Sequence, residues 1–67
     1  MNTNVLRGKW TQLKGEAKVQ WGKLTGDDLD QIEGDAEKLV GKLQERYGYE
    51  QERARAEVDS FFARYES

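Results

Sequence analysis

The chain contains no cysteine, no histidine and no proline. Without cysteine it can form no disulfide and no thiolate metal site, and without histidine it can form no histidine-based catalytic triad or Cys/His zinc site. We therefore expect none of these catalytic or metal sites, and we expect no cofactor, although carboxylates remain as possible ligands. The absence of proline also removes the residue that most strongly interrupts helices.

Large apolar side chains are scarce as well. Leu, Ile, Val and Phe together supply 13 of the 67 residues, whereas charged residues supply 36%. A chain of this size buries only about 60% of its unfolded surface, so we expect one small domain, residues 1–67, with a narrow stability margin. No apolar run approaches the roughly 20 residues that cross a bilayer, and the polar start is not followed by an apolar signal region. We expect a cytoplasmic monomer.

Apolar side chains recur every three or four residues in several segments, which is the spacing of amphipathic helices. The pattern predicts an all-α fold with four helices, at about residues 4–22, 26–33, 35–47 and 50–65. The side chains expected to form the core are Trp10, Leu13, Trp21, Leu29, Ile32, Leu39, Leu43, Tyr47, Val58, Phe61 and Phe62.

Capping signals lie between these segments. Thr25 with Asp28 three residues later predicts a capping box at the second helix. Asp35 can cap the third helix, and Gly48 can end it in the left-handed conformation. Three aspartates in the first turn of the second helix, Asp27, Asp28 and Asp30, could suggest a cation site. Their spacing does not fit an EF-hand loop, so we favour a capped helix start.

Glycines recur at intervals of seven residues in two blocks, and the second block repeats the first 26 residues later. The two sets are Gly8, Gly15 and Gly22, and Gly34, Gly41 and Gly48. A glycine inside a helix costs about 0.5–1 kcal/mol relative to alanine. In the first helix the glycines fall opposite the apolar stripe. They allow close backbone approach, keep the fold soft, or are simply tolerated, and the sequence leaves these three interpretations open.

Two segments resemble the hallmark sequences of the CsbD-like family of small bacterial stress-response proteins. Residues 21–28 read Trp-Gly-Lys-Leu-Thr-Gly-Asp-Asp, and residues 41–49 read Gly-Lys-Leu-Gln-Glu-Arg-Tyr-Gly-Tyr. The resemblance extends over roughly residues 5–65, although Gly26 and Glu50 depart from the pattern. It implies two roughly orthogonal helical hairpins in a bacterial cytoplasm, made under general stress, with no enzymatic activity. It supplies no catalytic or binding residues.

Charge is divided unevenly along the chain. Residues 1–26 carry a net charge of +4, whereas the whole chain carries −2. Arg7, Lys14 and Lys18 form a cationic flank beside the apolar stripe of the first helix. This flank could touch nucleic acid or an anionic membrane surface, or it could face the acidic helices of the same chain. We favour the second interpretation because the overall charge is negative.

The resemblance implies a non-enzymatic stress-response protein, and the high hydrophilicity and small core favour one that acts as a protectant or through weak association. The alternative is a binding module that uses the cationic flank on nucleic acid or an anionic membrane. The partner is not identified by the sequence.

Overall fold

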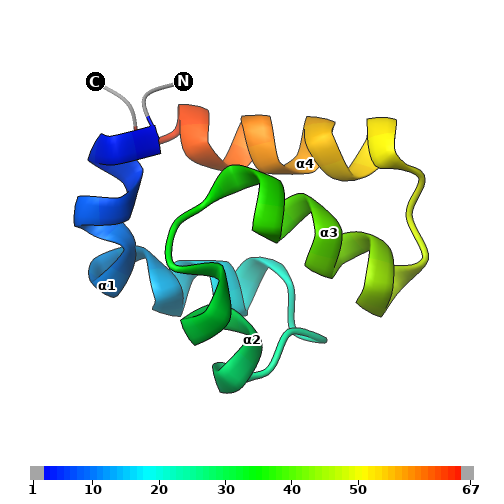
Figure 1. Ribbon diagram of the computed structural model, residues 1–67, viewed down its shortest axis with the longest axis horizontal. Helices are drawn as coiled ribbons and strands as arrows, with labels where there is room; N and C mark the ends of the chain where they lie inside the picture. Colours follow the sequence, from blue (N-terminus) through cyan, green and yellow to red (C-terminus); the bar gives the residue numbers. More distant parts are fainter. Residues whose placement is uncertain (1–2, 66–67) are drawn as a thin grey trace.

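The computed structural model describes residues 3–65, with side chains from residue 7 onward. Its four helices are α1 (Thr3–Gln20), α2 (Gly26–Ile32), α3 (Ala36–Tyr47) and α4 (Gln51–Ala63), and this part of the chain contains no strand (Figure 1). The predicted all-α class and the four helices are confirmed. Three of them end one or two residues earlier than predicted.

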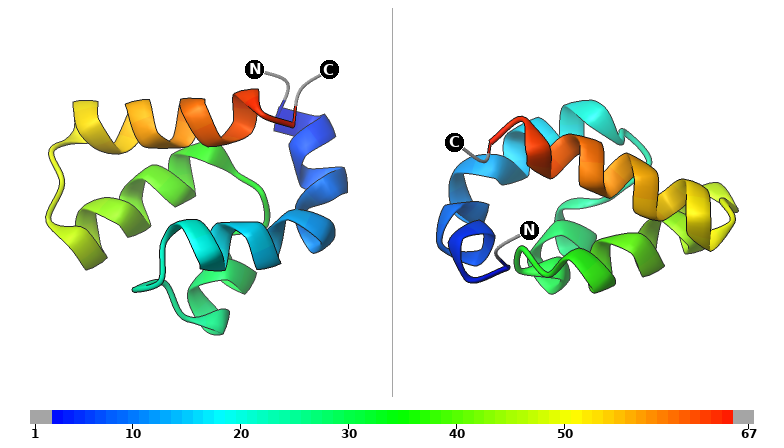
Figure 2. Two further views of the ribbon diagram at one scale, coloured as in Figure 1. Left: turned by 180° about the vertical axis from the view of Figure 1, so that it is seen from behind. Right: turned by 90° about the horizontal axis from the view of Figure 1, so that it is seen from above.

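The helices pack in sequence order around one core. Figures 1 and 2 show α3 and α4 side by side, and α1 changing direction along its length as it passes from the end of α4 toward α2. Helix α2 contacts both α1 and α3. These contacts are consistent with the predicted hairpins α1–α2 and α3–α4, and the roughly orthogonal arrangement of the two hairpins stays a prediction.

A single cluster of buried side chains joins all four helices. It contains every predicted core residue except Tyr47, which is only partly buried because it lies at the end of α3. The cluster also includes five residues outside the predicted core: Ala17, Leu24, Ala36, Val40 and Ala54. Inside it, the indole of Trp10 donates to the carbonyl of Leu29 at 2.8 Å and ties α1 to α2.

Three helix ends follow the three capping signals of the sequence. Thr25 and Asp28 form the predicted capping box, and Asp35 accepts from two backbone N–H groups at the start of α3. Gly48, with φ of 71°, ends α3 as predicted. Glu50 precedes α4 and makes no side-chain cap hydrogen bond.

Helix α2 ends differently from the prediction, which extended it to Glu33. Glu33 has φ of 55° and is followed by Gly34 with φ of 79°. Two successive left-handed residues reverse the chain direction, so α3 can fold back beside α2. The left-handed conformation is uncommon for a residue with a Cβ atom, so Glu33 is a point of local strain.

Three helical glycines leave open space around them. A Cβ atom built on Gly8, Gly15 or Gly41 would meet nothing within 4 Å. Close backbone approach within the chain therefore does not explain these glycines. A soft helix and simple tolerance remain as explanations, together with contact to a partner.

Candidate functional site

The most buried charge in the described chain is Asp28, whose side chain is 3% exposed. It lies in the first turn of α2, where its carboxylate accepts the backbone N–H of Thr25 at 3.0 Å. From α3, Arg46 donates to both carboxylate oxygens at 3.0 Å each, and the ammonium of Lys42 lies 3.5 Å away. Asp28, Lys42 and Arg46 form the ion cluster that joins α2 to α3.

The ion cluster keeps Asp28 ionised. The hydrogen bonds from Arg46, and then the one from the backbone of Thr25, hold the pKa of Asp28 well below its ordinary value, although burial acts in the opposite direction. The same contact raises the pKa of Arg46. A carboxylate that stays charged at neutral pH cannot donate a proton to a substrate. The ion cluster therefore acts as a structural link rather than as an acid–base pair.

Sequence reasoning identified Asp28 as a cap but missed its partners. Arg46 lies 18 residues further along the chain, on another helix. The sequence did contain one indication that Asp28 has a partner. Asp28 lies only about 40° from Ile32 on a helical wheel, so it borders the apolar face of α2. A charge at that border must be solvated or paired, and here it is paired.

The acidic first turn of α2 does not gather into a cation site. Asp27 and Asp30 are exposed, and the oxygens of Asp28 accept N–H groups. Between residues 3 and 65 no three acidic side chains lie close enough together to hold a metal ion. The geometry matches a capped helix start.

The cationic flank is engaged within the chain. Arg7 lies 3.5 Å from Asp35, and Lys14 lies 2.7 Å from Asp30. Lys18 donates to the backbone carbonyls that follow α1, at 2.8 Å and 2.6 Å. Arg7 and Lys14 share one shallow groove of about 330 Å³, whereas Lys18 lies outside it. The three cations thus form no single free patch.

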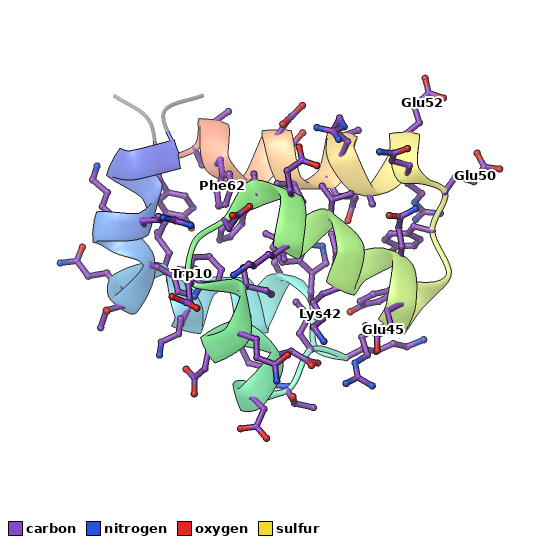
Figure 3. The ribbon with its side chains drawn as sticks, in the orientation of Figure 1. Trp10, Lys42, Glu45, Glu50, Glu52 and Phe62 are labelled. Atoms are coloured by element: carbon purple, nitrogen blue, oxygen red, sulfur yellow. The ribbon has the colours of Figure 1, made fainter. Side chains whose placement is uncertain are left out.

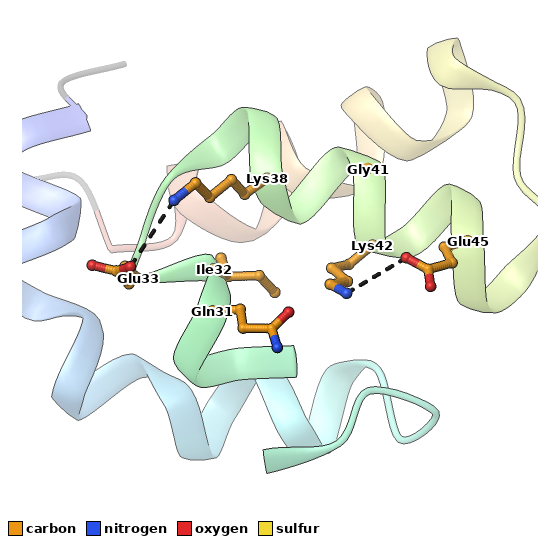
Figure 4. A pocket seen from close by; sticks show the side chains of 7 residues that line it. All are labelled: Gln31, Ile32, Glu33, Lys38, Gly41, Lys42 and Glu45. Atoms are coloured by element: carbon orange, nitrogen blue, oxygen red, sulfur yellow. Dashed lines mark hydrogen bonds and ion pairs between the residues drawn. The ribbon is translucent and has the colours of Figure 1, made fainter. Parts of the chain in front are cut away.

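A larger open groove of about 610 Å³ runs between α2 and α3 (Figure 4). Gly41 leaves room in one wall. The charges along the groove occur as two pairs, Lys42 with Glu45 at 3.5 Å and Lys38 with Glu33 at 4.0 Å. Because each cation has its own carboxylate, the groove carries no net charge and offers no free nucleophile.

Among the residues that the structure describes, no helix is both long enough and apolar enough to span a membrane.

Comparison with known proteins identifies the family. The CsbD-like family model matches residues 4–56. A UPF0337 protein of Xanthomonas axonopodis pv. citri is 57% identical over 61 residues, which cover 91% of this chain and 88% of that protein. A UPF0337 protein of Pseudomonas aeruginosa is 59% identical over 61 residues, covering 91% and 94%. The UPF0337 protein YjbJ of Escherichia coli K12 is 52% identical over 66 residues, covering 98% and 96%. The chain therefore belongs to the CsbD-like family of small bacterial proteins.

Proposed function

We propose that this protein is a non-enzymatic general stress-response protein of the bacterial cytoplasm, and that it acts as a hydrated protectant. One observation carries the proposal. Among the described residues, the only exposed large hydrophobic side chain is Val19, which is 83% exposed. A surface with a single isolated apolar residue provides no patch on which another protein could dock by burying apolar area.

The charged surface supplies the physical mechanism. Charged residues make up 36% of the chain, and many exposed cations are already paired with carboxylates of the same chain. Such a mixed-sign surface binds water and carries no large field of one sign. Monomers of this kind occupy space between other proteins as water is lost, and so reduce the encounters that lead to aggregation.

The non-enzymatic part of the proposal rests on the ionisable groups. Asp28 is the buried charge of the described chain, and it is committed to Arg46 and Lys42. In the described residues, every buried side-chain polar atom has a hydrogen-bond partner. An active site normally holds polar groups that wait for a substrate, and no buried polar side-chain atom of the described residues is left in that state.

A drying experiment tests the proposal. A drying-sensitive enzyme is dried and rehydrated with the wild-type protein, and its remaining activity is compared with that after drying with an equal mass of albumin. We expect the wild-type protein to preserve more activity. Absence of an advantage over albumin would contradict a protectant role.

A surface variant tests the mechanism. Gln12 and Glu16 are exposed on α1 near Val19, so Gln12→Leu/Glu16→Leu builds an apolar patch around that residue. The variant should self-associate and protect less well, while the matched Gln12→Ala/Glu16→Ala control should behave as the wild type. Equal protection by both variants would show that the lack of an exposed apolar patch is not the cause of protection.

The alternative function uses the cationic flank of α1 on nucleic acid or an anionic membrane. It stays a prediction without support from the contacts, since Arg7 and Lys14 pair with aspartates and Lys18 binds carbonyls. We therefore keep the protectant role as the conclusion.

A further inference from the structure

Two cations in the described part of the chain differ from all the others. The chain has 11 Lys and Arg residues, and nine of them lie within hydrogen-bond or ion-pair distance of an oxygen atom of the same chain. Within residues 7–65, the side chains of Lys23 and Arg53 have no such oxygen partner. Both side chains instead lie over tyrosine rings.

The two rings belong to one stacked pair. The ring centres of Tyr47 and Tyr49 are 5.0 Å apart, with an angle of 24° between the planes. The ammonium of Lys23 lies 5.1 Å from the centre of the Tyr47 ring, and the guanidinium of Arg53 lies 4.1 Å from the centre of the Tyr49 ring. Together Lys23, Tyr47, Tyr49 and Arg53 form the tyrosine platform.

The fold holds this platform in place. Lys23 follows α1, Tyr47 ends α3, and Arg53 belongs to the first turn of α4. Gly48 turns the chain with φ of 71° and so allows Tyr49 to return over Tyr47. Both tyrosines pack against the core, and the hydroxyl of Tyr47 accepts the backbone N–H of Lys23 at 3.2 Å. The rings are therefore fixed, while the two cationic groups are exposed.

We propose that the tyrosine platform is a weak binding site for single-stranded nucleic acid. Lys23 and Arg53 contact phosphates, and an unpaired base stacks against the Arg53–Tyr49 side of the platform. Arginine planes and aromatic rings are the groups on which unpaired bases stack, and neighbouring cations follow the backbone. This activity is separate from the protectant role, whose drying assay contains no nucleic acid.

Other anionic partners fit the platform less well. The bases of a duplex are already stacked on one another and cannot stack on a protein side chain. A membrane-binding surface inserts exposed apolar side chains, and the exposed large apolar residue of the described chain, Val19, lies on α1 rather than at the platform.

Acidic neighbours limit the strength of binding. Figure 3 shows Glu50 and Glu52 at the start of α4, with their carboxylates pointing outward from the molecule. They repel a phosphate backbone that approaches Arg53, which keeps the site weak. The variant Glu50→Gln/Glu52→Gln should consequently bind single strands more tightly than the wild type.

Fluorescence anisotropy of a labelled oligouridine at low salt tests the site. The variant Lys23→Gln/Arg53→Gln should bind about tenfold more weakly, and the slope of its salt dependence should fall by roughly 0.7 for each phosphate that is no longer neutralised. Tyr49→Leu removes the ring that holds the Arg53 guanidinium in place for the base, and without changing charge it should weaken binding about fivefold. The control, Arg7→Gln/Lys14→Gln, removes the same charge from α1 and should change affinity much less. Thermal melts confirm that each variant is folded.

Several outcomes would overturn the proposal. One is the absence of any anisotropy change with the wild-type protein up to about 1 mM, well above ordinary non-specific dissociation constants. Another is an equal loss of affinity in the platform and α1 double variants, which would mean general electrostatic attraction. Tighter binding to duplex DNA or to anionic phosphatidylglycerol vesicles than to the single strand would assign the surface to a different partner.

Discussion

Charged side chains serve two different purposes in two regions of this molecule. In the ion cluster, Asp28 is 3% exposed and holds α2 against α3 through Arg46 and Lys42. On the cationic flank, Lys14 pairs with Asp30 at a shorter distance, 2.7 Å, but their side chains are 37% and 64% exposed. A short distance alone therefore does not separate a structural ion pair from a surface one.

Exposure to water accounts for the difference. An exposed pair competes with solvent and salt, and contributes between nothing and about 1 kcal/mol. A buried carboxylate has no water to replace a missing partner, so removal of that partner is strongly destabilising. The ion cluster should consequently contribute strongly to the free energy of unfolding, whereas the ion pairs of the cationic flank should contribute little to it.

Removal of the buried charge should give the largest effect. Asp28→Asn keeps the side-chain shape but leaves Arg46 and Lys42 without their shared carboxylate, and we expect the free energy of unfolding to fall by about 2 kcal/mol. In a domain of this size that corresponds to a melting temperature roughly 10 °C lower. Asp30→Asn is the matched control and should change little. Equal melting temperatures for wild type and Asp28→Asn would mean that the ion cluster contributes no more to stability than an exposed ion pair.

The same residue should give the protein an acid-sensitive component of stability. The pKa of Asp28 is lowered on folding, so the unfolded chain takes up this proton at a higher pH than the folded chain. The stabilisation is complete above the unfolded value of about 3.9 and is lost as the pH falls toward the lower folded value. Urea unfolding at a series of pH values should show the gap between wild type and Asp28→Asn shrinking below that point. If this difference in the free energy of unfolding grew as the pH fell, the pKa of Asp28 would be raised on folding rather than lowered.

Alanine at two helical glycines should give smaller effects of the opposite sign. Gly15 lies on α1 and Gly41 lies on α3, and a Cβ atom built at either position meets nothing within 4 Å. Gly15→Ala and Gly41→Ala should each raise the free energy of unfolding by about 0.5–1 kcal/mol. Gly48→Ala is the contrasting control and should destabilise, because φ there is 71°. A lower melting temperature for Gly15→Ala or Gly41→Ala would reveal a close contact in solution.

The smallest effect should come from the cationic flank. Lys14→Gln breaks the pair with Asp30, and we expect the free energy of unfolding to fall by about 0.5 kcal/mol or less. Thermal melting at low and high salt measures this contribution, which should disappear as salt screens the pair. A decrease as large as that of Asp28→Asn would remove the distinction between the two regions.

Local features of the fold could be predicted from the sequence because their causes are local. Apolar spacing within each segment located the four helices, and Thr25 with Asp28 located a helix start. Gly48 located a helix end, since it takes the left-handed conformation that the turn requires. These signals depend on residues within a few positions of one another.

Contacts between helices could not be predicted in the same way. Periodicity gives the apolar face of each helix but not its rotation against a neighbour, so the pairing of Asp28 with Arg46 could not be predicted. Tyr47 was expected in the core, yet it lies at the margin, where Tyr49 and Lys23 contact its ring. The charge balance favoured internal pairing of the cationic flank, although it did not identify the partners.

Hydrogen bonds join α1, with Trp21 just after it, to α4, with Tyr65 just after it, and they connect residues far apart in the sequence. Lys9 donates to the carbonyl of Tyr65 over 56 residues, and Trp21 donates to Glu57 over 36, whereas Arg55 of α4 reaches Glu37 of α3 over only 18. Closure of a longer loop costs more chain entropy, so we expect the α3–α4 hairpin to form early and α1 to dock late. Removal of the Trp21–Glu57 hydrogen bond should then accelerate unfolding while leaving the folding rate nearly unchanged. The lifetime of the folded state would thus depend on how firmly its first helix is attached to its last.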